Sequence, residues 1–121
     1  MTKSILTVDD SQTMRDMLLL ALEDAGFRVV QAGDGVEGLE VLRTETPDVI
    51  ITDINMPRMD GFGFIEEVRR HPNHRATPIL VLTTESEPDR KERARRAGAT
   101  GWIVKPFNTA KLVEAIRRVA A

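Results

Sequence analysis

The chain has 121 residues, 41% of them hydrophobic, which is enough for one ordinary domain with a buried core and too little for two. It contains no cysteine, which excludes structural disulfides, cysteine-bound zinc, iron–sulfur clusters and a thiol nucleophile, and its 2 histidines are too few for a histidine-rich metal site. The formal net charge of −2 gives no overall attraction to nucleic acid.

Short runs rich in valine, isoleucine and leucine recur along the chain and predict β-strands. They lie at residues 4–8, 28–31, 48–52, 78–82 and 101–104. The first, third and fourth runs are almost unbroken apolar, which is typical of strands buried on both faces. No apolar run approaches the roughly 20 residues needed to cross a bilayer. The first residues also lack a signal-peptide pattern, so we expect a cytoplasmic protein without membrane insertion.

The segments between these runs have helical spacing. Four of the expected helices begin just after a side chain that can cap a helix N-terminus: Asp10 or Ser11, Asp34, Asp60 and Asn108. The first of them is expected to end at Gly26, a residue type favoured just past a helix C-terminus. The remaining segment, 88–97, offers little more than Ala94 and Ala97 to a core, so we expect a lightly packed helix there.

Strands that alternate with helices predict a parallel sheet with helices on both faces, which is an α/β fold of three layers. Right-handed crossovers leave few topologies, and at this size we expect the flavodoxin-like strand order 2-1-3-4-5 in one doubly wound domain spanning residues 1–121. Ligands of such sheets bind beyond the carboxyl ends of the strands, where the strand order reverses. The residues that follow each strand are therefore the candidates for a site.

Polar side chains follow four of the predicted strands. They are Asp9 and Asp10 after the first, Asp53 after the third, Thr83 and Thr84 after the fourth, and Lys105 after the fifth. Two carboxylates about 4 Å apart repel by about 4 kcal/mol at an effective dielectric constant of roughly 20, so three of them need a cation. Oxygen ligands without imidazole or thiolate suit Mg²⁺, with Mn²⁺ as a substitute. A lysine and a threonine hydroxyl on the same rim suit a phosphoryl group, and an aspartate can be the nucleophile that forms an acyl phosphate.

Four pieces of sequence surround these residues: VDDS at 8–11, TDINMPRMDG at 52–61, Thr83, and GWIVKPF at 101–107. Together they resemble the receiver domain of two-component response regulators, most closely the stand-alone chemotaxis type (CheY-like), over essentially the whole chain. The resemblance implies that Asp53 accepts a phosphoryl group from a histidine kinase, that Thr83 hydrogen-bonds this group and that Lys105 pairs with it. In this family the bond between that lysine and the following proline is typically cis. The resemblance also implies a Mg²⁺ site made of Asp10, Asp53, the backbone carbonyl of Asn55 and, through a water, Asp9.

Further residues are expected to tune this switch. The resemblance implies that Asn55 and Glu85 influence the water that hydrolyses the acyl phosphate, although ordinary loop polarity also explains them. Trp102 occupies the position of an aromatic residue that rotates inward on phosphorylation, where tyrosine or phenylalanine is usual. The alternative is a partly buried indole at a sheet edge. Thr84 stands where the family has a very small residue, so its β-branched side chain is expected to narrow the entrance to the site.

The output surface is expected to combine the helix at 88–97, the strand at 101–104 and the last helix. Residues 90–96 are strongly basic, which suits either a solvated face or an acidic docking segment on a partner. The resemblance suggests a flagellar motor switch protein, a phosphatase or a kinase as that partner. Without interleaved aromatic residues or a helix-turn-helix pattern, the basic run does not indicate DNA binding. We expect a signalling switch rather than an enzyme, with phosphotransfer and self-dephosphorylation as its chemistry.

Other functions stay open at this point. A receiver of this size serves chemotaxis or acts as a phosphorelay shuttle. A Mg²⁺-dependent phosphohydrolase similar to haloacid dehalogenases would use Asp53 as its nucleophile, but Asn55 stands where such an enzyme needs an acid, and nothing in the sequence suggests a cap domain. A flavodoxin-like flavin carrier needs a hydroxyl-rich loop after the first strand, where this chain has two aspartates.

Overall fold

Strands and helices alternate along residues 2–120, the part of the chain that the computed structural model describes. The strands are β1 (Ser4–Val8), β2 (Arg28–Ala32), β3 (Val49–Thr52), β4 (Ile79–Thr83) and β5 (Gly101–Val104). The helices are α1 (Gln12–Asp24), α2 (Gly35–Val41), α3 (Gly61–Arg70), α4 (Pro88–Ala97), α5 (Thr109–Val119) and a short 3₁₀ helix, η1 (Pro72–His74), which was not predicted. All strand pairs are parallel, in the order β2-β1-β3-β4-β5, which confirms the predicted flavodoxin-like topology.

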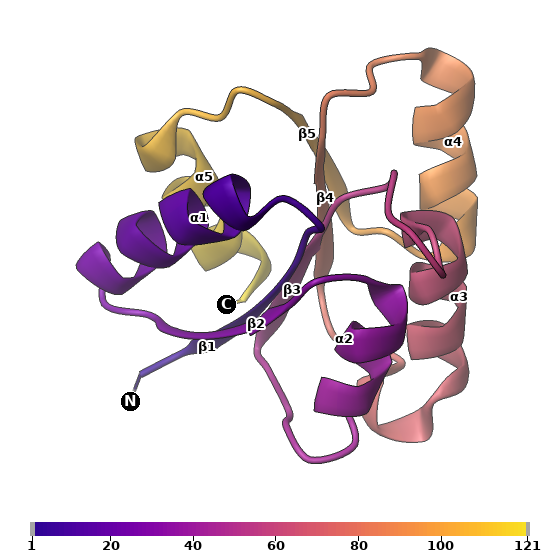
Figure 1. The fold of residues 1–121 in the computed structure, drawn as a ribbon, viewed down its shortest axis with the longest axis horizontal. Coiled ribbons are helices and arrows are strands. Elements are labelled where there is room, and N and C mark those ends of the chain that lie inside the picture. The colour runs from indigo at the N-terminus through magenta and orange to yellow at the C-terminus, as the bar shows by residue number, and fades with distance from the viewer. Residues whose placement is uncertain (1, 121) are drawn as a thin grey trace.

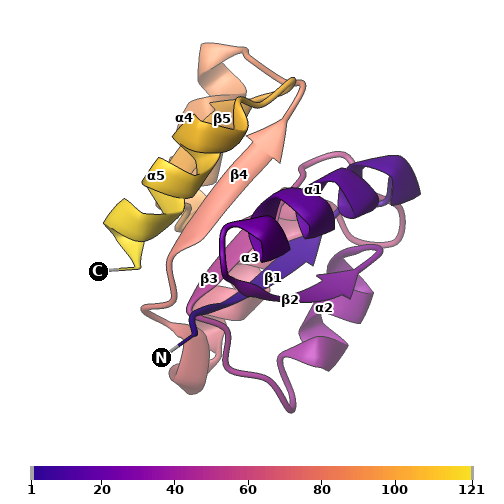
Figure 2. The same ribbon diagram turned by 90° about the vertical axis from the view of Figure 1, so that its left-hand side faces the viewer.

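The sheet lies between two layers of helices. Figure 1 shows α1 and α5 on one side of it and α2, α3 and α4 on the other, and the turned view in Figure 2 brings α1 and α5 to the front. Each interface holds its own apolar core, because successive side chains of a strand point to opposite faces. In β1, for example, Ile5 packs in the core under α1 and α5, whereas Leu6 packs in the core under α2 and α3.

The three central strands are buried along their whole length, as their unbroken apolar sequences predicted. The two edge strands are partly exposed. Four strand boundaries, in β2, β3 and β4, differ from the predicted ones by a single residue. One of these differences has a simple cause: Pro78 has no N–H to donate, so β4 begins at Ile79, although the Pro78 carbonyl still accepts a hydrogen bond from Ile50 N–H at 2.9 Å.

Four of the helices begin directly after a predicted capping residue. A side-chain oxygen of each capping residue accepts a hydrogen bond from a backbone N–H in the first turn; these residues are Ser11, Asp34, Asp60 and Asn108. Helix α4 has no side-chain cap, and within it only Ala94 is buried, which confirms a lightly packed helix. Across residues 2–120, no helix combines the length and the apolar character that a membrane span requires.

The first residue of α3, Gly61, allows this helix to approach the end of β3. A Cβ atom on Gly61 would overlap the carbonyl oxygen of Asp53 and lie 2.7 Å from Cα of Ile54. We expect Gly61→Ala to lower the free energy of unfolding by about 2 kcal/mol, because backbone must move to make room. Urea denaturation measures this change.

The matched control is Gly63→Ala, two residues further along α3. A Cβ on Gly63 would meet no atom closer than 3.4 Å. Alanine also loses less backbone entropy than glycine in a helix, so this variant is expected to gain about 0.5–1 kcal/mol. Equal effects of the two substitutions would contradict the close approach of α3 to Asp53.

Candidate active site

The carboxyl ends of four neighbouring strands meet at one edge of the sheet. The register pairs Val8 with Thr52 and Thr83 with Val104, so β1 ends level with β3 and β4 ends level with β5; Thr52 lies opposite Val81, so the second pair extends two residues further. The pairing continues just past the strands, where Asp53 N–H donates to the Val8 carbonyl at 2.9 Å and Lys105 N–H donates to the Thr83 carbonyl at 2.8 Å. The strand order therefore gathers the polar residues that follow these strands.

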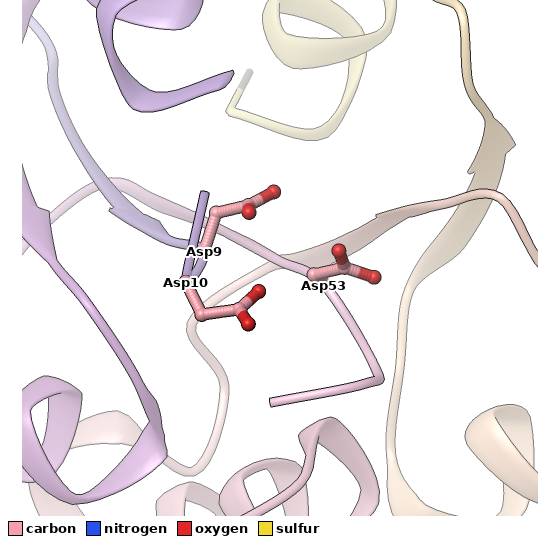
Figure 3. A group of neighbouring side chains, drawn as sticks. All are labelled: Asp9, Asp10 and Asp53. Atoms are coloured by element: carbon pink, nitrogen blue, oxygen red, sulfur yellow. The ribbon is translucent and has the colours of Figure 1, made fainter. Parts of the chain in front are cut away.

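Three aspartates form an acidic cluster at this edge. One carboxylate oxygen from each of Asp9, Asp10 and Asp53 lies within 4.8 Å of the other two. Figure 3 shows the carboxylates of Asp9 and Asp10 at the end of β1, both directed toward the side on which Asp53 lies. Asp9 is buried, Asp53 is half-buried and Asp10 is exposed. Only Asp10 therefore presents its carboxylate openly to solvent.

Lys105 reaches into this cluster from the end of β5. Its ammonium donates to Asp53 Oδ2 at 2.8 Å and to Asp9 Oδ2 at 2.9 Å, and the three side chains are only 11%, 12% and 3% exposed. Burial lowers the pKa of Lys105, but the hydrogen bonds to Asp53 and Asp9 outweigh burial and leave this pKa above its ordinary value. The bond between Lys105 and Pro106 is cis, as the resemblance implied.

The Asp9 carboxylate is held on both oxygens by the protein itself. Oδ1 accepts a hydrogen bond from Ser11 N–H at 2.9 Å, and Oδ2 accepts from Lys105. Burial raises the pKa of the Asp9 carboxyl above its ordinary value, although both hydrogen bonds act in the opposite direction. The ionised form of Asp9 is therefore costly here and depends on its neighbouring cation.

The donor set fits a hard divalent cation. Three carboxylates against one ammonium leave a formal local charge of −2 (three negative charges, one positive). The available ligand atoms are oxygens, and Mg²⁺ accepts a few carboxylate ligands while it keeps several waters. Asn55, whose backbone carbonyl is the further expected ligand, lies in the β3–α3 loop two residues after Asp53. Sequence and geometry thus agree on a candidate Mg²⁺ site.

Thr83 and Thr84 differ in exposure although they are adjacent. Thr83 is fully buried at the end of β4, and its hydroxyl oxygen accepts a hydrogen bond from Glu85 N–H at 3.3 Å. Thr84 is exposed. Trp102 is half-buried on β5, and its indole N–H donates to the Glu85 carbonyl at 3.1 Å. The loop after β4 is therefore tied both to Thr83 and to Trp102.

One residue at this edge was missed by the sequence reasoning. Arg90, in the first turn of α4, contacts both expected tuning residues: its Nε lies 3.6 Å from Glu85 Oε2, and its Nη2 lies 3.5 Å from Asn55 Oδ1. Asn55 Nδ2 in turn donates to Glu85 Oε1 at 3.0 Å. The sequence placed Arg90 only in a basic run, and no sequence signal separates it from the other arginines of that run.

A second unpredicted contact fixes the β3–α3 loop. Arg58 adopts a left-handed backbone conformation (φ 65°), which is uncommon for a residue other than glycine. Its guanidinium makes two hydrogen bonds to the carboxylate of Asp34, at 2.7 and 3.0 Å. This pairing holds the pKa of Asp34 below its ordinary value, helped by the Glu37 N–H that Asp34 caps. The ion pair therefore joins the loop that carries Asn55 to the start of α2.

Comparisons with known proteins agree with this geometry. A family profile described as "Response regulator receiver domain" matches residues 5–117. A probable chemotaxis protein CheY from Rhizobium etli is 37% identical over 116 residues, which cover 95% of this chain and 90% of that protein. The structure of the Vibrio cholerae chemotaxis protein CheY4 is similar with a TM-score of 0.94 and 45% identity, and the match covers 98% of this chain and 99% of that one.

A second similar structure holds a metal. It is the receiver domain of the sensor histidine kinase PA1611 from Pseudomonas aeruginosa, with a magnesium ion coordinated in its active-site cleft. It has a TM-score of 0.92 and 28% identity to this chain, with coverage of 99% of this chain and 98% of that one.

Several other curated relatives are longer, and this chain spans 55% or less of their length. The profile match, the sequence relatives and the structures favour a receiver over a phosphohydrolase or a flavin carrier, and the chain belongs to the response regulator receiver domain family.

Proposed function

We propose that this chain is a phosphorylation-controlled switch that takes a phosphoryl group from the phosphohistidine of a histidine kinase onto Asp53, with Mg²⁺ bound beside it. The observation that carries the proposal is the acidic cluster of Asp9, Asp10 and Asp53 with Lys105 in contact with two of the three. An isolated capping role explains none of these contacts. Lys105 precedes the N-terminus of α5, and a cation there opposes the helix dipole. Helix stability therefore does not explain its position.

The proposed transfer is an in-line displacement that depends mostly on positioning. An oxygen of the Asp53 carboxylate attacks phosphorus while the phosphorus–nitrogen bond of the phosphohistidine breaks, which leaves an acyl phosphate on Asp53 and a free imidazole on the donor. Asp10, Asp53 and the Asn55 carbonyl would hold Mg²⁺, and Asp9 would act through a water. When bound, Mg²⁺ neutralises charge on the phosphoryl oxygens and on the acids. Lys105, already paired with Asp53, would follow the new negative charge.

The proposed switch uses contacts that exist only when the phosphoryl group is present. Moving a two-state protein from 1:99 to 99:1 takes about 5.5 kcal/mol of differential interaction. Thr83 and Lys105 are the proposed sources, since both lie at the same sheet edge as Asp53. If the Thr83 hydroxyl turns to the phosphoryl group, it gives up its contact with Glu85 N–H, and the loop that holds the Trp102 indole rearranges with it.

The proposed output surface is formed by α4, β5 and α5, and the proposed setting is chemotaxis. The similar proteins from Rhizobium etli and Vibrio cholerae are described as chemotaxis proteins. The basic helix α4 favours an acidic docking segment, for example on a flagellar motor switch protein or on a phosphatase. A phosphorelay shuttle would use the same site and no such docking segment. Weaker partner binding as ionic strength rises distinguishes the docking role.

The experiment that tests the site and the switch together is a beryllofluoride titration with Mg²⁺, because beryllofluoride mimics a phosphoryl group on an aspartate. Trp102 is the single tryptophan of the chain, and its indole is bonded to Glu85 in the loop after β4. Tryptophan fluorescence therefore reports on this one position. We expect a saturable change that requires Mg²⁺ and is absent in Asp53→Asn. A saturable change that persists in Asp53→Asn would place the binding site elsewhere.

Mg²⁺ alone is expected to stabilise the folded chain, because the unfolded chain does not assemble the cluster. At a concentration 100 times its Kd, a ligand of the folded state adds about 2.7 kcal/mol, which appears as a higher Tm that EDTA removes. Asp10→Asn should lose most of this gain. Asp16→Asn, with the same charge change at an exposed position of α1, is the control and should keep it. A full gain in Asp10→Asn would contradict the proposed ligands.

A further inference from the structure

Arg90 closes a ring of polar contacts between helix α4 and the rim of the site. Both Glu85 carboxylate oxygens are engaged, Oε1 by the Asn55 amide at 3.0 Å and Oε2 by Arg90 Nε at 3.6 Å. The ring is completed by Arg90 Nη2, which donates to Asn55 Oδ1 at 3.5 Å. At 3.6 Å the Arg90–Glu85 contact is an ion pair rather than a hydrogen bond. The three side chains come from different segments: the β3–α3 loop, the β4–α4 loop and α4.

Arg90 is held in this position and is not a freely solvated charge. Its Nε is buried without a hydrogen-bond partner, so the carboxylate of Glu85 is the group that compensates it. Its guanidinium also lies 5.4 Å from the centre of the Phe62 ring. The guanidinium of Arg93, one turn later, lies 4.1 Å from the centre of the same Phe62 side chain. Among the described residues, Arg93 makes none of the contacts to Glu85 or Asn55 that Arg90 makes. The two arginines therefore share the contact with Phe62, and of the two only Arg90 takes part in the polar ring with Glu85 and Asn55.

The ring restrains the two side chains that flank Asp53. While it is closed, the Asn55 amide donates to Glu85 and the Glu85 carboxylate is shared between Asn55 and Arg90. Both side chains are then held in one orientation, which limits where either can place a water. Hydrolysis of the acyl phosphate needs a positioned water. The water oxygen bonds to phosphorus while the bond from phosphorus to the Asp53 oxygen breaks, and the protons of the water leave with the released phosphate.

We infer that Arg90 is a positioning residue that lengthens the lifetime of the phosphoryl group by holding Asn55 and Glu85 in this ring. The inference rests on the proposed function, since it concerns the loss of the phosphoryl group from Asp53. It also gives α4, part of the proposed output surface, a direct contact with the rim of the site.

The test compares loss of label from the full chain after phosphorylation with radiolabelled acetyl phosphate and Mg²⁺. Releasing two weak polar contacts is expected to make Arg90→Ala lose the label about three- to tenfold faster than the wild type. Arg90→Lys keeps the charge but cannot span both oxygens, so its rate should fall between the two. The matched control, Arg93→Ala, removes the same charge and the same aromatic contact, and its rate should stay within about twofold of the wild type.

Two further readouts separate positioning from a general loosening of α4. In a Glu85→Gln background, the Arg90→Ala substitution should change the rate less than it does alone, because the two residues act through one contact. The single Trp102 indole resonance in a ¹H–¹⁵N spectrum should shift in Arg90→Ala and not in Arg93→Ala, since the indole is bonded to the Glu85 carbonyl. Equal rates for Arg90→Ala and Arg93→Ala overturn the inference, whereas a wild-type chain that takes no label on Asp53 overturns the proposed function first.

Discussion

Asp53→Asn is expected to abolish covalent phosphorylation of the chain. An amide is not the nucleophile that a carboxylate is, so no acyl phosphate forms. The substitution keeps the size of the side chain, and its remaining oxygen can still accept the hydrogen bond that Ile54 N–H donates to Asp53 Oδ1 at 2.6 Å. The measurement is the intact mass after incubation with acetyl phosphate and Mg²⁺, followed by peptide mapping of the modified residue.

The control for this prediction is Asp16→Asn, which makes the same charge change on the exposed side of α1 and should be phosphorylated as fully as the wild type. Mapping should locate the phosphoryl group of the wild-type chain on Asp53. A phosphoryl group on another side chain, or full modification of Asp53→Asn, would show that the acidic cluster is not the acceptor site.

Lys105→Met is expected to destabilise the fold at neutral pH. The side chain of Lys105 is 11% exposed, and its ammonium is bonded to Asp9, whose side chain is 3% exposed, and to Asp53. Removing one partner of a largely buried ion pair leaves uncompensated charge, which costs about 3 kcal/mol. Urea denaturation at neutral pH without Mg²⁺ measures the loss. Lys111→Met, at an exposed position of α5, is the matched control and should have little effect.

The loss in Lys105→Met should shrink as the pH is lowered. Burial already raises the pKa of Asp9, and the loss of Lys105 removes one of the two contacts that lower it while the Ser11 N–H hydrogen bond remains, so this pKa rises further. A carboxyl whose pKa is higher in the folded than in the unfolded chain favours folding when protonated, and this contribution is lost as the pH rises through the folded pKa. The deficit is therefore largest near neutral pH and smallest toward the ordinary Asp pKa of about 4. A pH-independent deficit would show that Lys105 stabilises the fold by packing rather than by charge.

The sequence alone determined the architecture of this protein. Unbroken apolar runs predicted which strands are buried on both faces, and capping residues predicted where helices begin, because both signals are local. Once the strand order was known, the residues after each strand had to meet at one edge, so the three aspartates and Lys105 were predicted together. The weak apolar pattern at 88–97 likewise predicted the lightly packed α4.

Only the tertiary structure decided which side chains pair at that edge. Lys105 bonds to Asp9 across 96 residues of sequence, and Arg90 contacts Asn55 across 35. Arg58 pairs with Asp34 from a left-handed loop position that no sequence pattern marked. Periodicity reports which face of an element a residue lies on, but the choice of partner depends on strand register, loop path and side-chain rotamer at once. Arg90 and Arg93 are equivalent in the sequence, and they differ in the structure because only Arg90, in the first turn of α4, reaches the loops that flank Asp53.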